Sequence, residues 1–187
     1  KDVFSFDAST TVKAGLFIDG KLAGRIMKKD FIKNMASGRK VDFNRKPSEK
    51  FNKNGSFTLV NGVLESASLR KDNCLGWMND DANFTVDLGT SQNVKKVTLY
   101  CMQEGIDFII LPKSVTVYYS GDDGKFTMAG KTKFSYSGED YVKIEVTFDS
   151  FNARYVKLRA DNPGKVTAGK VSHNKDFWLL LDEVVIE

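Results

Sequence analysis

The single histidine of this chain lies in a polar segment close to the carboxyl end. The segment VSHNKDFWLLLDEVVIE places His173 and Asn174 just before an apolar run that starts at Phe177 and ends at Ile186. This pattern predicts a loop of hydrogen-bonding side chains mounted on a strand that is packed on both faces. Proteins often place binding groups on such loops. Ordinary surface turns have the same composition, so both interpretations of His173 remain open.

The sequence offers no paired side chains for covalent catalysis. Asp182 and Glu183 are adjacent carboxylates, but neighbours on a strand point to opposite faces and therefore cannot act on one bond as an acid–base pair. No Cys-x-x-Cys spacing suits a metal, and Cys101 ends the alternating run VTLYC, which favours a buried thiol. Spacing alone does not decide whether Cys101 pairs with Cys74. Because no nucleophile–base or acid–base set can be assembled, we expect a chain that is not an enzyme.

The composition indicates a folded domain with an ordinary surface. The 187 residues include 14 Phe and are 41% hydrophobic, which is enough for the core of one medium domain. The net charge of +4 is small and the signs alternate along the chain, so we expect no nucleic-acid partner. No apolar run approaches the roughly 20 residues of a membrane helix, so we expect no membrane insertion. With no initiator Met and no signal peptide, Lys1 looks like the cut end of a longer protein.

Alternation of apolar and polar residues dominates the chain from residue 84 onward. The polar turn sequences LGTSQN, SGDDGK, SYSGED and ADNPGK separate the alternating runs. Short strands and turns at this spacing predict an all-β protein, an antiparallel jelly-roll β-sandwich. In the last strand the apolar phase shifts after Leu181, which predicts a bulge near Asp182 and Glu183. The alternating runs cover residues 84–88, 97–101, 115–119, 142–148 and 156–160.

The first part of the chain follows a different pattern. Residues 10–31 alternate around an Asp19-Gly20 turn, which predicts a β-hairpin. A two-stranded hairpin is only marginally stable in water, so it must pack on the main domain or be the remnant of an upstream β-domain. A polar connector follows, and we place the domain boundary there. Residues 1–46 are the N-terminal β-hairpin and connector, and residues 47–187 are the β-sandwich.

Four stretches, in their order along the chain, resemble a known family: FTLVNGVLES, LGWMNDDANFTVDLG, LPKSVTVYYSGDDGKF, and ARYVKLRADNPGK together with FWLLLDEVVIE. Over about residues 48–187 they resemble the discoidin-like domain (coagulation factor 5/8 type C), a fold class that includes the family-32 carbohydrate-binding modules. The particular resemblance is to the C-terminal domain of bacterial family-20 β-hexosaminidases, or chitobiases. It implies an eight-strand, galactose-binding-domain-like jelly roll. It also implies loops at one end that hold a sugar, and a catalytic barrel upstream of this chain.

The resemblance further implies a structural calcium between the first strands and the last one. Family members use an Asp-Gly turn, nearby backbone carbonyls and a Glu of the last strand, and these positions read Asn61-Gly62 and Glu183 here. Asn in place of Asp removes a negative charge, whereas Ca²⁺ takes about six to eight oxygens with carboxylates among them. Two possibilities remain open: a weak Ca²⁺ on Asn61 and Glu183, or a calcium-free turn in which Glu183 meets backbone amides or a lysine. Residues 122–124 lack the further ligands of an EF-hand and are predicted to form a hairpin turn.

The resemblance also implies where a sugar would bind. Family modules use the loop after the strand that matches VTLYC and the loop before the last strand, which read MQEGIDF and SHNKDF here. A sugar needs a flat apolar face for stacking and planar polar groups that bind hydroxyls in pairs. The polar candidates are Gln103, Glu104, Asp107, His173 and Asn174, and the apolar candidates are Phe108 and Phe177.

Three features qualify these candidates. Galactose-binding members usually carry His and Arg in the first loop, and this chain has neither, so galactose, a different ligand and no ligand all remain open. Phe108 and Phe177 continue into the apolar runs FIILP and FWLLL, which favours core packing for both side chains. Trp77, which follows a turn near the binding end of family members, is predicted to fill the core beneath these loops.

These observations support one principal hypothesis and one alternative. The principal hypothesis is a non-catalytic carbohydrate-binding accessory domain of a secreted bacterial glycoside hydrolase of the chitobiase type. The alternative is a structural domain that packs on the catalytic domain without binding sugar. Phospholipid adhesion, as in animal discoidin domains, is disfavoured because the loops are mostly polar. The expected partners are a glycan or monosaccharide and the upstream catalytic domain, for a monomer that is periplasmic, on the cell surface or secreted.

Overall fold

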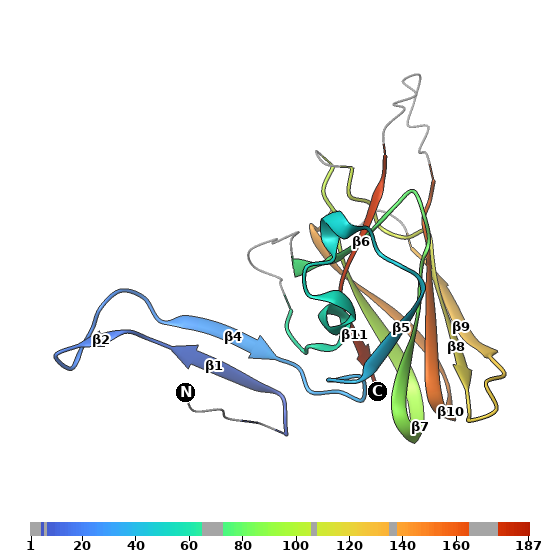
Figure 1. Cartoon of the computed structure of the whole chain (residues 1–187), viewed down its shortest axis with the longest axis horizontal. Helices are drawn as coiled ribbons and strands as arrows, with labels where there is room; N and C mark the ends of the chain where they lie inside the picture. The colour runs from blue at the N-terminus through green and yellow to red at the C-terminus, as the bar shows by residue number, and fades with distance from the viewer. Residues whose placement is uncertain (1–4, 6, 65–72, 106–107, 135–137, 165–175) are drawn as a thin grey trace.

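The structure, a computed structural model, describes residues 5, 7–64, 73–105, 108–134, 138–164 and 176–187. Figure 1 shows a β-sandwich from which a long hairpin arm projects. Among the described residues, seven strands form the antiparallel sheet of the sandwich, in the order β6-β11-β7-β10-β8-β9 with β5 beside β7. The elements are β1 (Thr10–Ala14), β2 (Phe17–Ile18), β3 (Lys21–Leu22), β4 (Met27–Phe31), β5 (Lys40–Arg45), the 3-10 helices η1 (Glu49–Phe51) and η2 (Gly55–Val60), β6 (Leu75–Met78), β7 (Ala82–Met102), β8 (Ser114–Ser120), β9 (Thr127–Lys133), β10 (Tyr141–Asp161) and β11 (Trp178–Ile186).

Two long strands, β7 and β10, connect the two layers of the sandwich. The first part of β7 pairs with β5 and with the second part of β10, whereas its second part pairs with β11 and with the first part of β10. The predicted antiparallel all-β sandwich is therefore confirmed. The segment LGTSQN was predicted to separate two strands, and this was wrong because it lies within β7. Gly89, with a φ of 83°, lets the strand bend there without ending.

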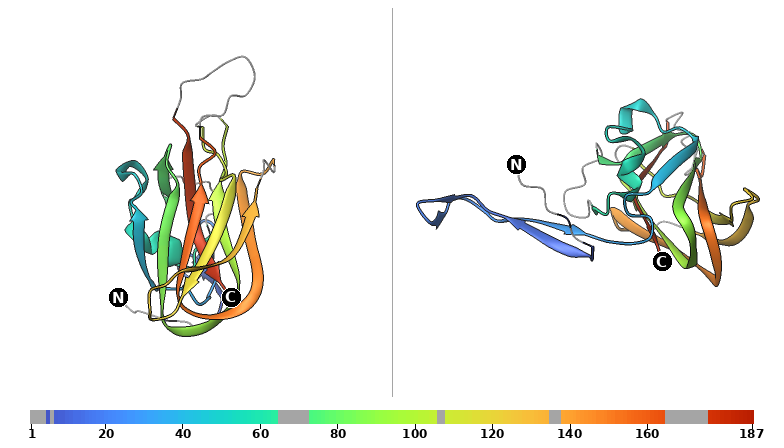
Figure 2. Two further views of the ribbon diagram at one scale, coloured as in Figure 1. Left: turned by 90° about the vertical axis from the view of Figure 1, so that its right-hand side faces the viewer. Right: turned by 60° about the horizontal axis from the view of Figure 1, so that its bottom comes forward.

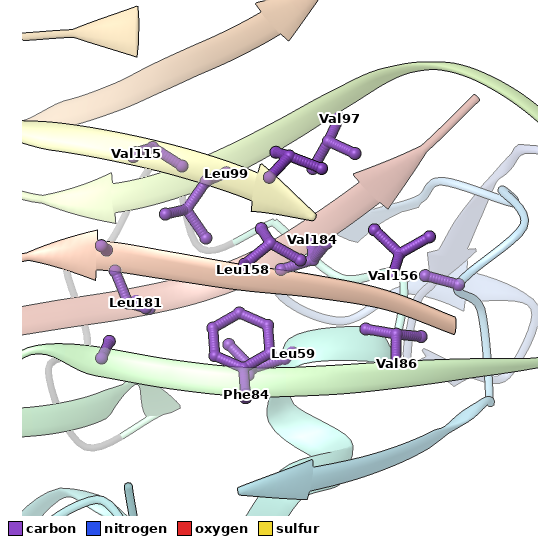
Figure 3. Packing of buried hydrophobic residues seen from close by; sticks show 14 of the residues in the cluster. Leu59, Phe84, Val86, Val97, Leu99, Val115, Val156, Leu158, Leu181 and Val184 are labelled. Carbon is purple, nitrogen blue, oxygen red and sulfur yellow. The ribbon is translucent and has the colours of Figure 1, made fainter. Parts of the chain in front are cut away.

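The core lies between the two layers (Figure 3). In one layer Phe84 lies opposite Leu158, and in the other Leu99 lies opposite Val184. All four side chains are fully buried, and burial of such a side chain stabilises the fold by about 1.5–3 kcal/mol. The alternation in the sequence arises because every second residue of these strands faces this core.

Trp77 fills the core next to the start of β7, as predicted. The side chain is buried, and its ring stacks on Phe84 at a centroid distance of 6.5 Å. Its indole N–H donates a hydrogen bond of 2.9 Å to the carbonyl oxygen of Arg45 on β5. The bond satisfies the one polar group of the ring, which would otherwise be costly to bury.

The last strand, β11, has an irregularity where the sequence predicts a bulge. The register between β11 and β7 shifts between Leu181 and Val184, and both intervening carboxylates are buried. Asp182 accepts a hydrogen bond from the Tyr141 hydroxyl. The bulge turns Asp182 and Glu183 towards polar partners while the apolar residues on either side remain in the core.

The N-terminal arm is a β-hairpin, as predicted. Strands β1 and β4 pair along their length, and β2 and β3 pair around the Asp19-Gly20 turn. Asp19 and Gly20 have φ values of 49° and 74°, as this type of tight turn requires. The right-hand view in Figure 2 shows the arm extending away from the sandwich. Its large exposed apolar side chains are Leu16, Phe17, Ile18, Leu22, Ile26 and Met27.

The base of the arm joins the sandwich beside the carboxyl end of the chain. The Ile32 N–H donates to the Gly62 carbonyl at 2.7 Å, and the Met35 N–H donates to the Ile186 carbonyl at 3.1 Å. Strand β5, which follows, pairs with β7. The main sheet therefore takes one strand from the segment 1–46. The described residues include no helix of the length and apolarity that a membrane crossing needs.

Candidate functional site

Strand ends gather at one pole of the sandwich and surround a pocket of about 430 Å³. β7 and β9 end there, and β8 and β10 begin there. The described residues that line the pocket are Gln103, Glu104, Gly105, Ile109, Ile110, Leu111, Lys113, Phe134, Asp140 and Pro163. A mostly apolar wall with a few polar groups is typical of a small-ligand site.

Backbone hydrogen bonds fix the polar side of this pocket. The Gln103 N–H donates to the Asp140 carbonyl at 2.8 Å, and Glu104 and Ile109 exchange two bonds of 2.9 Å each. These bonds tie Glu104 to Ile109 between β7 and β8. Gln103 is only 8% exposed, so only a small part of its side chain can contact a ligand. The carboxamide of Gln103 and the carboxylate of Glu104 have planar polar ends of the kind that bind adjacent hydroxyls.

Phe108 and Phe177, the apolar candidates, pack against each other. Their rings meet edge to face with centroids 5.8 Å apart. Phe177 is buried, Phe108 is partly exposed, and neither lines the pocket. Phe108 has a φ of 56°, a left-handed conformation that is rare for a bulky residue. Such strain is kept only where the surrounding contacts enforce it.

The loop that carries Phe108 is joined to the start of β11. The Trp178 N–H donates to the Phe108 carbonyl at 3.0 Å, and the Ile110 N–H donates to the Trp178 carbonyl at 2.9 Å. Trp178 also packs edge to face on Phe51 of η1, with centroids 4.9 Å apart. The two loops that the resemblance implies for sugar binding are thus adjacent where the structure describes them.

Several predicted site residues lie outside the described part of the chain, and several residues that line the pocket were not predicted. Asp107, His173 and Asn174 lie outside the described residues, so their positions remain predictions. Phe134, Asp140 and Pro163 also line the pocket and were not among the predicted site residues. SYSGED and ADNPGK signalled turns, but a turn signal does not tell at which pole of the sandwich the turn lies.

Glu183 and the turn at Asn61-Gly62 meet inside the structure, as both the implied calcium site and the calcium-free turn require. The Gly62 N–H donates to Glu183 Oε2 at 3.1 Å, and the Glu183 side chain has 0% exposure. Glu183 Oε1 has no hydrogen-bond partner among the described residues. Burial raises the pKa of this carboxyl to about 9, with the Gly62 N–H opposing the shift and the charge of Asp182 adding to it.

These residues fit a weak cation site. A buried carboxyl oxygen without a partner is a group that a cation would satisfy, and Asn61 Oδ1 accepts one hydrogen bond of 2.7 Å, from Val63, with capacity for a second interaction. In the described part of the chain, no three His, Cys, Asp or Glu side chains come together as metal ligands. Ca²⁺ would therefore depend on backbone carbonyls for most of its roughly six to eight oxygens.

A two-layered antiparallel β-sandwich with a loop-built pocket at one pole defines the chain as a discoidin-like domain. The family model described as F5/8 type C domain matches residues 50–178. The chain belongs to the F5/8 type C domain family. A search of curated protein sequences gave no match.

Solved structures with the same fold include lectin domains and carbohydrate-binding modules. The lectin domain of lectinolysin complexed with Lewis B antigen has 21% identity and a TM-score of 0.57, over 83% of this chain and 96% of that one. The family 32 carbohydrate-binding module of EndoD from Streptococcus pneumoniae has 15% identity and a TM-score of 0.56, over 83% and 99%. The module CpGH89CBM32-5 from Clostridium perfringens, in complex with GalNAc-β-1,3-galactose, has 18% identity and a TM-score of 0.52, over 79% and 93%.

Proposed function

We propose that this chain is a non-catalytic carbohydrate-binding domain whose ligand occupies the pocket beside Gln103 and Glu104. The observation that carries the proposal is the composition of that pocket, about 430 Å³ in volume. Ile109 and Phe134 provide apolar wall for the C–H face of a sugar, and the two planar polar side chains provide partners for its hydroxyls. The glycan complexes among the structures of the same fold support the proposal.

The proposed domain acts as an accessory to a catalytic domain in the same polypeptide. A shallow sugar site gives modest affinity, with a dissociation constant of about 0.1–1 mM, or roughly 4–5.5 kcal/mol. That is sufficient because tethering raises the effective concentration of the linked enzyme at its substrate. The four motifs, in their order along the chain, favour a bacterial glycoside hydrolase of the β-hexosaminidase (chitobiase) type as the parent. We place it in the periplasm, on the cell surface or outside the cell, with this domain as a monomer.

A structural Ca²⁺ on Asn61 and Glu183 is part of the proposal. The unpartnered Oε1 of Glu183 supports it. The ion would tie the Asn61-Gly62 turn to the last strand, and its role would be to stabilise the fold rather than to contact the sugar.

A glycan array followed by NMR titration tests the sugar site. We expect saturable binding of N-acetylhexosamine or galactose glycans, with shifts in the loops around Gln103 and residue 173. Glu104→Ala should weaken binding about tenfold or more, because it removes a charged hydrogen-bond acceptor. Glu145→Ala, on an exposed part of β10, is the matched control and should bind normally. Array binding to no glycan, together with no shifts in these loops, would refute the site.

One observation favours a second function, in which the domain packs on its catalytic neighbour without binding sugar. Phe17 and Ile18 at the far end of the arm are 61% and 58% exposed, and such a group of apolar side chains favours a protein cover. Deleting the domain from the parent protein separates the two functions. A structural domain predicts a lower unfolding temperature with unchanged binding to insoluble glycan, whereas a sugar-binding domain predicts reduced binding.

A further inference from the structure

A second hollow, of about 230 Å³, adjoins the proposed sugar pocket. It is lined by Lys113, Ser114, Lys131, Lys133 and Asp161. Lys113 lines both the pocket and this hollow, so the two adjoin at that residue. We call the second hollow the basic groove.

The backbone fixes the lysines of the basic groove. The Lys113 N–H donates to the Asp161 carbonyl and the Phe134 N–H donates to the Lys113 carbonyl, each at 3.0 Å. Lys113 is thereby held between the end of β10 and the end of β9. Lys131 and Lys133 are two positions apart on β9 and therefore lie on the same face of the sheet.

Positive charge exceeds negative charge around the basic groove. Asp161 is its one acidic lining residue, and it pairs with Arg159 at 2.9 Å and with Lys131 at 3.6 Å. Arg159 is itself shared with Asp81, at 2.8 Å. Lys113 and Lys133 have no ion-pair partner within the described ranges. In and around the basic groove there are thus four cationic side chains, those of the three lysines and Arg159, and two carboxylates, those of Asp161 and Asp81.

Asp161 remains ionised in this setting, so its negative charge belongs among the two carboxylates. Burial acts to raise the pKa of its carboxyl, but the Ser114 hydroxyl and the charges of Arg159, Lys131 and Lys113 outweigh burial and hold the pKa below its usual value. Its oxygens are occupied by the Ser114 hydroxyl and by Arg159. The unpaired ammonium groups are therefore available to an anion from outside.

We propose that the basic groove binds the anionic group of an acidic oligosaccharide, a sulfate ester or a carboxylate, whose neighbouring sugar occupies the pocket. This inference rests on the proposed sugar site and adds the class of its ligand. The pocket itself carries Glu104 and Asp140, which repel an anion, whereas Lys131 and Lys133 line only the basic groove. The ligand is consequently oriented, with its charged residue towards Lys131 and Lys133.

Calorimetric titration of the whole chain tests the inference with three oligosaccharides of equal length: chondroitin sulfate, unsulfated chondroitin and a neutral N-acetylglucosamine oligomer. We expect at least one acidic ligand to bind about tenfold more tightly than the neutral one, with the advantage lost at high salt. The first two ligands distinguish the sulfate ester from the carboxylate. The double substitution Lys131→Ala and Lys133→Ala should remove the advantage and leave neutral binding unchanged.

The matched control is Lys53→Ala with Lys125→Ala, two exposed lysines that do not line the groove and whose loss changes the net charge equally. It should keep the advantage. Two outcomes would overturn the inference while leaving the sugar site intact. One is equal affinity for acidic and neutral ligands, and the other is tighter binding of the acidic ligand that persists without Lys131 and Lys133. Lysine-dependent binding of the acidic ligand without any neutral binding would support the basic groove and count against the neutral-sugar site. Circular dichroism confirms that each variant is folded.

Discussion

Asn79 and Phe177 are joined by two hydrogen bonds across a separation of 98 positions in the sequence. The Phe177 N–H donates to Asn79 Oδ1 at 2.9 Å, and the Asn79 N–H donates to the Phe177 carbonyl at 2.8 Å. Asn79 Nδ2 also donates to Asp176 Oδ1 at 2.7 Å. One side chain thus fastens the turn between β6 and β7 to the start of β11, beside the loop that carries the proposed ligand groups.

Replacing Asn79 should loosen this attachment. Asn79→Gly suits the backbone, because the residue has a φ of 52°, and removes only the two side-chain bonds. We expect the free energy of unfolding in urea to fall by about 1–2 kcal/mol, the cost of losing such bonds to a partly buried partner. Asn93→Ala, which loses one long bond of 3.4 Å to Asn152 on the exposed surface, is the control. A loss no larger for Asn79→Gly than for the control would show that the attachment does not stabilise the fold.

A methyl group at Gly76 should not fit. A Cβ there would lie 2.8 Å from Leu180 Cδ2 and 2.8 Å from Phe51 Cβ. Because η1 and β11 must separate to make room, Gly76→Ala should lower the free energy of unfolding by about 1–3 kcal/mol. The midpoint of urea unfolding should fall accordingly. Gly121→Ala meets no described atom within 4 Å and should change stability little. Equal midpoints for the two variants would show that η1 can move away from residue 76 without loss of stability.

Glu183 should make the metal-free protein less stable as the pH rises. The folded state holds this proton up to about pH 9, whereas the unfolded chain releases it near the ordinary value of 4.5. Between these values the unfolded state binds fewer protons, so stability falls with rising pH by up to about 1.4 kcal/mol per pH unit. Glu183→Gln cannot ionise, and its stability relative to the native chain should improve steadily up to about pH 9 and then level off.

Urea unfolding in the presence of a chelator, from about pH 6 to about pH 9, measures this difference. If the free energies of unfolding of the two proteins changed with pH in parallel, Glu183 would be ionised in the metal-free fold. Added Ca²⁺ provides a second measurement. It should raise the unfolding temperature of the native chain more at higher pH, where the carboxylate is available, and Glu183→Gln should lose most of that increase.

The exposed end of the arm should promote self-association without stabilising the sandwich. Phe17→Ser combined with Ile18→Ser should reduce light scattering at high concentration, because both side chains are largely exposed. The free energy of unfolding should change by less than about 0.5 kcal/mol. Lys13→Ser with Lys21→Ser alters the same arm without removing apolar surface and serves as the control. A large loss of stability in the first variant would show that these side chains pack on the sandwich.

Alternation in the sequence was sufficient for the long strands and for one local irregularity. It was wrong for β5, because residues 40–45 were predicted to belong to a polar connector and instead pair with β7. Alternation predicted the inward faces of β7, β8 and β10, because one residue in two must face the core. The phase change after Leu181 predicted the bulge that turns Asp182 and Glu183 towards polar partners. LGTSQN was misread as a break between strands, because turn residues also occur where a long strand bends. Local composition does not distinguish these two cases.

The site was less accessible to sequence reasoning. Gln103 and Glu104 line the pocket, but the rest of its wall comes from segments that are distant in the chain, such as Phe134 and Pro163. The basic groove forms only because β9 and the end of β10 enclose Lys113. Which pole a turn occupies depends on strand order, and strand order is a property of the whole fold rather than of any segment.

The carboxyl end of the chain, where Glu187 exchanges backbone bonds with Lys96, lies at the pole opposite the pocket, next to the base of the arm. A sensor chip or bead coupled through Glu187 would therefore display the pocket and the basic groove outwards, clear of the solid support. Densely coated beads should then retain polymeric glycan far longer than the single-site affinity suggests, since many pockets face the same polymer at once.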